Sequence, residues 1–118
     1  MTVGIDTVEI ERIKELINKE RFLERVFSEE EIREFSLRNY KPEHIAAAFA
    51  SKEAFSKAIG TGVSGFKLTE VSLLHFENGK PYLKFSGNAL SIVTEKGLSF
   101  DVSVTHTNTL ATVVVVGF

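Results

Sequence analysis

The segment from Pro42 to Gly60 limits the possible folds more than any other part of this sequence. It reads PEHIAAAFASKEAFSKAIG. Proline is favoured at the first position of a helix, alanine is the best helix former, and glycine commonly follows the last helical residue. Alanine on several sides also lets neighbouring backbones come close. The segment therefore predicts one long helix that packs tightly against other elements.

The residues before this helix predict a strand followed by shorter helices. Val3 and Ile5 alternate with Gly4 and Asp6, which is typical of a short strand. Apolar residues then recur at helical spacing from Ile10 to Ile17. Further on, Ser28-Glu29-Glu30-Glu31 forms a capping box, which predicts a helix that runs to about Arg38.

The residues after Gly60 favour strands. We expect strands at Phe66–Phe76 and Tyr82–Phe85, a helix at Ala89–Lys96, and a final strand pair at Phe100–Thr105 and Leu110–Phe118. Asn78-Gly79 predicts a hairpin with a type I′ turn. The expected fold class is α+β, with N-terminal helices, including the long alanine-rich one, packed on an antiparallel sheet.

Length and composition exclude several classes of protein. A chain of 118 residues fits one domain spanning residues 1–118. Its 14 basic and 16 acidic residues argue against a protein that binds nucleic acid mainly through phosphate contacts. It has no cysteine, and no apolar segment approaches the ~20 residues that span a bilayer. We expect a cytoplasmic protein with neither a nucleic acid nor a membrane partner.

Two carboxylates are candidates for a metal site. Asp6 lies where the first strand leads into a helix, and Glu53 lies in the long helix. Carboxylate oxygens suit Mg²⁺, which takes one or two of them and leaves its other positions to water and phosphate. The structural alternative is that Asp6 caps a helix and Glu53 is solvated.

Lys57, Gly60-Thr61-Gly62 and His106 are candidates for binding an anion. Lys57 shares one side of the helix with Glu53, where the alternative is a simple ion pair between them. Glycines let a backbone approach a ligand closely, although Gly60 also serves as a helix end. His106 ends a strand between the hydroxyls of Thr105 and Thr107, which favours an anion, although a lone histidine is more often structural.

Basic residues are frequent near the first helix. The residues that could meet an acidic partner are Arg12, Lys14, Lys19, Arg21 and Arg25. Glutamates lie between them, so a solvated surface of mixed charge is the alternative interpretation.

Taken together, the motifs resemble one family over the whole chain. The residues that carry the resemblance are Gly4–Ile13, Phe49–Ala58, Gly60–Gly62, Asn78–Pro81 and Ser103–Thr107. In order and spacing they are similar to the holo-[acyl-carrier-protein] synthases, which are 4′-phosphopantetheinyl transferases. Ala48 departs from the pattern, because many members carry an arginine there. We expect this change to remove a phosphate contact, for which Lys52 would compensate.

The resemblance implies an enzyme of fatty acid biosynthesis. It would move 4′-phosphopantetheine from coenzyme A to a serine of apo acyl carrier protein, with Mg²⁺ as cofactor, and release adenosine 3′,5′-bisphosphate. By resemblance, the metal ligands are Asp6 and Glu53, and the catalytic residues are Glu53 and Lys57. The residues that would contact coenzyme A are Lys57, Gly60, Thr61, Gly62, His106 and Thr107. Those that would contact the carrier protein are Arg12, Lys19, Arg21 and Arg25. Either Glu53 or a water on the metal would take the serine proton.

The resemblance also implies a homotrimer with active sites between subunits, so that His106 would serve a neighbouring chain.

Two other functions remain open. One is a homologue that binds the carrier protein without catalysis, against which the joint presence of Asp6, Glu53, Lys57 and His106 speaks. The other is an unrelated Mg²⁺-dependent phosphohydrolase, which would need no acceptor protein.

Overall fold

The computed structural model describes all 118 residues and has the expected α+β class. In chain order the elements are β1 (Thr2–Glu9), α1 (Ile10–Ile17), α2 (Phe22–Val26), α3 (Glu29–Leu37), α4 (Pro42–Ile59), a 3₁₀ turn η1 (Leu68–Glu70), β2 (Val71–His75), β3 (Pro81–Phe85), α5 (Gly87–Lys96), β4 (Phe100–His106) and β5 (Leu110–Gly117). None of its helices has the length and apolar character that crossing a membrane requires.

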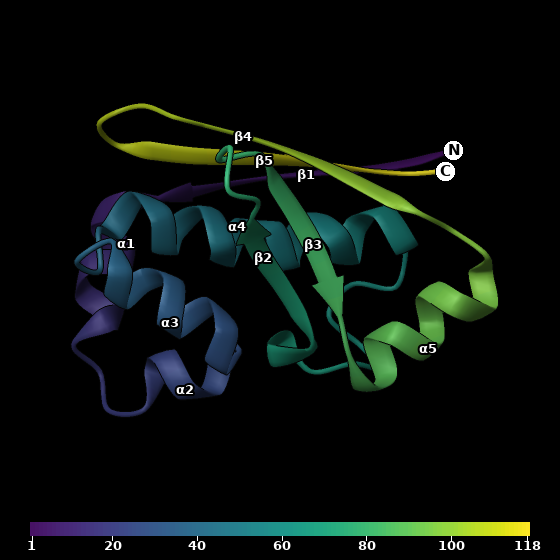
Figure 1. Ribbon diagram of the computed structural model, residues 1–118, viewed down its shortest axis with the longest axis horizontal. Helices are drawn as coiled ribbons and strands as arrows, with labels where there is room; N and C mark the ends of the chain where they lie inside the picture. Colours follow the sequence, from purple (N-terminus) through teal and green to yellow (C-terminus); the bar gives the residue numbers. More distant parts are fainter.

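The long helix α4 packs on one face of a three-stranded antiparallel sheet of order β1-β5-β4 (Figure 1). It begins at Pro42 and ends at Ile59, and the following Gly60, with a φ of 80°, caps the helix as predicted. The helix and the sheet come very close at Gly4, where an added Cβ would lie 1.9 Å from the carbonyl oxygen of Ala54. Glycine and alanine therefore let β1 rest directly on the helix backbone.

The other side of α4 is covered by the remaining elements. Helix α3 and the two-stranded sheet β2-β3 lie there, and α5 follows at the end where α4 terminates (Figure 1). The capping box of α3 is present as predicted, with the Ser28 hydroxyl accepting the Glu31 N–H and the Glu31 carboxylate accepting the Ser28 N–H. Helix α4 is thus buried on two sides, which explains its many alanines.

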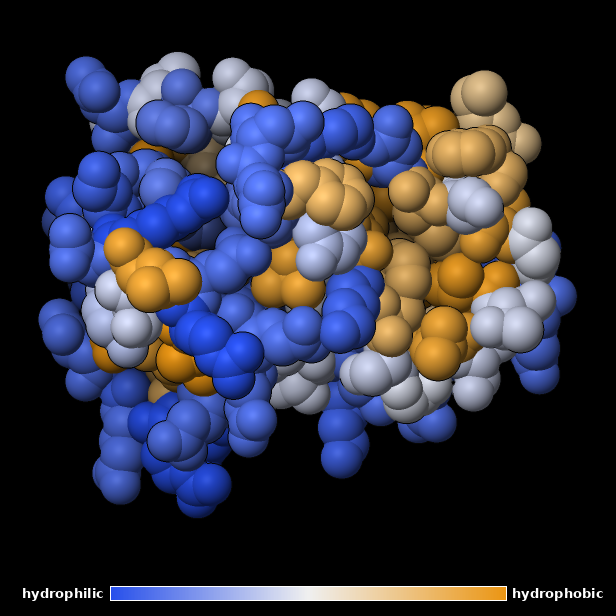
Figure 2. Space-filling model, in the orientation of Figure 1, coloured by the Kyte–Doolittle hydropathy of each residue, from blue (hydrophilic) through white to orange (hydrophobic).

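The face of the three-stranded sheet that points away from α4 has no protein layer over it. Its apolar side chains include Val3 and Ile5, which are 63% and 56% exposed, and Phe118, which is 60% exposed. Figure 2, which views this sheet from its edge, shows further apolar side chains toward the right of the molecule, while the left is mostly hydrophilic. An exposed apolar face of this kind is typical of an interaction surface.

Two details of the second half differ from prediction. Strand β2 begins only at Val71, because Leu68–Glu70 forms a 3₁₀ turn. The hairpin turn is not type I′, which requires a positive φ at both central residues. Of Asn78 and Gly79 only the glycine has a positive φ. The Gly79 N–H donates to the Phe76 carbonyl, and the Asn78 side chain accepts the Lys80 N–H, which holds a longer loop.

Replacing Glu70 with alanine is expected to lower the free energy of unfolding by about 1 kcal/mol. The Glu70 carboxylate accepts N–H groups of Lys67 at 2.9 Å and Asn88 at 3.1 Å, and so caps α5, whose own N-cap side chain makes no bond. These N–H groups, Lys67 first, hold the pKa of Glu70 below its usual value. The contribution is therefore complete above pH 4.5 and is lost as the pH falls through the lowered pKa.

Urea unfolding of both proteins at neutral and at acidic pH measures this contribution. The matched control is Glu77→Ala, a substitution at an exposed glutamate of the β2–β3 loop. A difference between Glu70→Ala and the wild type that persists unchanged in acid would contradict the capping role.

Candidate active site

Asp6 and Lys57 meet at the edge of the sheet where β1 passes over α4. The Lys57 ammonium donates to the Asp6 carboxylate at 3.3 Å and to the Ile5 carbonyl at 2.9 Å. The Asp6 side chain is only 18% exposed, whereas that of Lys57 is 55% exposed. The carboxylate is thus fixed in a protected place, and the ammonium bridges from it toward solvent.

Glu53 lies one turn before Lys57 on the same side of α4 and is half-buried. No ion pair joins it to Lys57, so the simple alternative of a Glu53–Lys57 pair does not describe this structure. Lys57 reaches Asp6 from this side of α4, and α4 packs along β1. Gly60 and Gly62 follow directly, both with positive φ and open space around them. This leaves the backbone beyond Lys57 accessible to a ligand.

The donor set at this place suits Mg²⁺ better than a transition metal. It offers two carboxylates, those of Asp6 and Glu53, and no group of three or more acidic, histidine or cysteine side chains in the chain is placed to hold a metal ion. Mg²⁺ commonly binds through one or two carboxylates, with water and substrate phosphate completing its octahedron.

His106 and Thr107 lie at the other end of α4. They line a hollow together with Lys14, Glu43 and Asn108. Glu43 is in the first turn of α4 and Lys57 in the last, so they are separated by about 21 Å along the helix axis. One chain alone therefore does not bring His106 to Lys57 and Gly60.

The basic residues expected to meet a carrier protein are all exposed. The Arg12 guanidinium lies 5.9 Å from the centre of the Phe49 ring. Lys19 and Arg21 border a shallow hollow whose other lining residues include Ile17, Phe22 and Leu23. Arg21 and the exposed Glu24 form an ion pair at 3.6 Å. Charge and apolar surface thus occur side by side between α1 and α2.

A buried ion pair on the far side of α4 was not predicted. Lys52 donates to Glu31 at 2.6 Å, and both side chains are fully buried. Burial lowers the pKa of Lys52 and raises that of Glu31. The expectation that Lys52 replaces a phosphate contact is therefore wrong, because no ligand reaches it. The sequence signal for its burial was that Lys52 shares one side of the helix with the apolar residues Ile45, Phe55 and Ile59.

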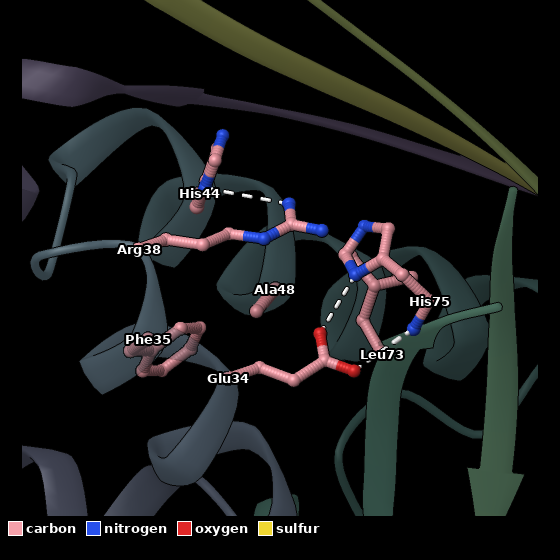
Figure 3. Close-up of a pocket in the computed structure, with 7 residues that line it drawn as sticks. All are labelled: Glu34, Phe35, Arg38, His44, Ala48, Leu73 and His75. Atoms are coloured by element: carbon pink, nitrogen blue, oxygen red, sulfur yellow. Dashed lines mark hydrogen bonds and ion pairs between the residues drawn. The ribbon is translucent and has the colours of Figure 1, made fainter. Parts of the chain in front are cut away.

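Ala48 lies in a small hollow between α3, α4 and β2 (Figure 3). Here the Glu34 carboxylate accepts the ring Nδ1–H and the backbone N–H of His75, at 2.8 and 3.0 Å. Arg38 extends over Ala48 to the His44 ring. The pKa of His44 is lowered, mainly because the ring is partly buried and in addition because the Arg38 guanidinium lies beside it. Ala48 is on the opposite side of α4 from Lys57, about 180° around the helix.

Comparison with known proteins decides the family. A family model described as the 4′-phosphopantetheinyl transferase superfamily matches residues 2–112. The chain belongs to this superfamily. A holo-[acyl-carrier-protein] synthase from Thermoanaerobacter sp. (strain X514) is 41% identical over 111 residues, which are 92% of this chain and 80% of the relative. One from Treponema denticola is 40% identical over 116 residues, 97% of this chain and 94% of the relative.

Solved structures of holo-[acyl-carrier-protein] synthases share the fold. The holo-[acyl-carrier-protein] synthase from Neisseria meningitidis has a TM-score of 0.90 and 28% identity, and covers 99% of this chain and 97% of its own. The Helicobacter pylori enzyme, solved in complex with coenzyme A, has a TM-score of 0.85 and 31% identity, and covers 98% of this chain and 99% of its own. The chain is an enzyme, and these relatives place it among the holo-[acyl-carrier-protein] synthases.

Proposed function

We propose that this transferase moves 4′-phosphopantetheine from coenzyme A to a serine of apo acyl carrier protein and releases adenosine 3′,5′-bisphosphate. In this reaction the serine oxygen forms a bond to the phosphorus that carries pantetheine. The bond from that phosphorus to the bridging oxygen breaks, and the serine proton passes to a base. The observation that carries the proposal is the contact of Lys57 with Asp6, beside Glu53, in a chain of this superfamily.

Asp6 and Glu53 are the residues that would hold Mg²⁺. When bound, the ion supplies positive charge that stabilises the negative charge developing on the leaving group. Lys57 contributes a second positive charge, and its 55% exposed side chain can turn from Asp6 to a diphosphate. Glu53 is the candidate among the protein's own residues for accepting the serine proton.

The remaining substrate contacts follow from the positions of the exposed groups. The open backbone at Gly60–Gly62 lies next to Lys57 and suits the nucleotide. His106 and Thr107 suit the 3′-phosphate of coenzyme A, since an imidazole and a hydroxyl both donate to phosphate oxygens. Arg12, Lys19, Arg21 and Arg25 form the surface for the acidic carrier protein, and the apolar hollow between α1 and α2 adds area to it.

The active site is proposed to lie between subunits of a homotrimer. Two observations support this arrangement. His106 lies at the opposite end of α4 from Lys57, so a second chain is needed to complete the coenzyme A site. In addition, the outer face of the three-stranded sheet exposes Val3, Ile5 and Phe118, which a neighbouring subunit would cover.

Intact-mass spectrometry of apo acyl carrier protein tests the function. With this protein, coenzyme A and Mg²⁺, the carrier protein is expected to gain the mass of one phosphopantetheine. Excess chelator should remove the gain, and added Mg²⁺ should restore it. No gain with several carrier proteins would contradict the transferase and favour a carrier-binding homologue without catalysis. Cleavage of coenzyme A without a carrier protein would favour a hydrolase.

A further inference from the structure

Lys52 is adjacent to Glu53 in α4, but it points about 100° away around the helix, toward α3 and β2. Its ammonium donates to Glu31 Oε1 at 2.6 Å and to the Val71 carbonyl. It also lies 5.2 Å from the centre of the Phe27 ring. The buried charge is therefore surrounded by partners from three separate segments of the chain.

Glu31 extends this contact to the neighbouring elements. Its Oε2 accepts the Leu73 N–H at 3.0 Å, and its Oε1 accepts the Ser28 N–H at 3.0 Å. Hydrogen bonds are directional, so this set of contacts is satisfied at one rotation of α4 relative to α3 and β2. The Lys52–Glu31 pair thus joins α4 to two elements on the side away from the sheet.

A gain in stability is a weak reason for a buried ion pair. Burying two charges costs several kcal/mol per ion, and apolar replacements of similar volume are often neutral or stabilising. On the sheet side of α4, the buried Ala54 and Ala58 lie against Gly4 of β1, and such small residues offer few interlocking side chains. A helix with such a smooth side needs a directional contact elsewhere to keep it from turning about its own axis.

We propose that Lys52 and Glu31 are positioning residues which fix the rotation of α4 and thereby direct Glu53 and Lys57 toward Asp6. The inference rests on the proposed function for the role of those three residues. Lys57 is held to Asp6 at 3.3 Å, so a small rotation of α4 would separate the two. A misplacement of about 1 Å at reacting groups can cost about a hundredfold in rate.

The test is a charge-free double variant, Lys52→Met/Glu31→Gln. Methionine preserves most of the lysine volume, and the glutamine oxygen still accepts a backbone N–H. We expect cooperative unfolding, a kcat at least about tenfold below that of the wild type and a raised KM for coenzyme A, because the rotation would displace Lys57 together with Glu53. The matched control is Ser51→Ala on the same helix, since the buried Ser51 hydroxyl bonds only to the Ala48 carbonyl of its own helix. Its kcat should be unchanged.

Hydrogen exchange of the α4 amides gives a readout that is independent of transfer. Amides near Glu53 and Lys57 should exchange faster in the double variant than in Ser51→Ala, and equal exchange together with wild-type kcat would overturn the proposal. If the double variant does not fold, Glu31→Gln alone takes its place, and wild-type kcat in that protein would overturn the proposal. A wild type that transfers nothing counts against the proposed function, while the exchange comparison still decides the positioning role.

Discussion

Glu53→Gln is expected to lower the rate of phosphopantetheine transfer by at least about a hundredfold. The substitution keeps the shape of the side chain and removes one of the two negative charges that would hold Mg²⁺. Glu53 is half-buried on α4 and makes no hydrogen bond or ion pair to another side chain, so the fold should be preserved. Transfer is measured by intact mass of the carrier protein, and folding by circular dichroism.

A metal role for Glu53 has a further consequence. Because an amide oxygen is a weaker ligand than a carboxylate, raising the Mg²⁺ concentration should partly restore transfer by Glu53→Gln but not by Glu53→Ala. The control is Glu95→Gln, the same change at an exposed residue of α5. Transfer by Glu53→Gln at the wild-type rate would remove Glu53 from the site.

Gly4→Ala is expected to destabilise the protein by at least about 3 kcal/mol, the upper part of the range for overpacking. The added Cβ would lie 1.9 Å from the Ala54 carbonyl oxygen and 2.7 Å from the Ala58 nitrogen. Both are backbone atoms, so neither can turn aside as a side chain would. β1 must move away from α4, and that movement separates Asp6 from Lys57.

Denaturant unfolding measures the effect on stability, and the transfer rate of the folded fraction measures the effect on the site. The control is Gly97→Ala, because Gly97 has a φ of 61° and open space around it. That change is expected to cost only about 1–2 kcal/mol, from the left-handed conformation alone. If Gly4→Ala is no more destabilising than the control, the close contact of β1 with α4 is not essential.

Local patterns in the sequence predicted the elements well where neighbouring residues decide them. Pro42 and Gly60 mark the limits of α4 because helix ends depend on the backbone of adjacent residues. The capping box at Ser28 was predicted for the same reason. The hairpin at Asn78-Gly79 was predicted, but its turn type was not, because a dipeptide does not determine the length of the loop. The Asn78 side chain binds the Lys80 N–H and supports a longer connection.

The candidate site was predictable only in part. The resemblance grouped Asp6, Glu53 and Lys57, and the structure adds that Lys57 donates directly to Asp6. The role of Lys52 was mistaken because its partner, Glu31, is 21 residues away in sequence. A lysine in an apolar helical stripe signals a buried charge, but only the packing of α3 and β2 against α4 identifies what neutralises it.

Subunit complementation tests most directly whether the active site is shared between chains. Glu53→Gln and His106→Ala proteins would be unfolded together and refolded as a mixture, beside each variant refolded alone. If Glu53 and His106 of different chains form one site, the mixture contains some sites with neither substitution. Transfer at low coenzyme A concentration should then clearly exceed the mean of the two variants. Transfer equal to that mean, or a wild type that is fully active as a monomer, would contradict a shared site.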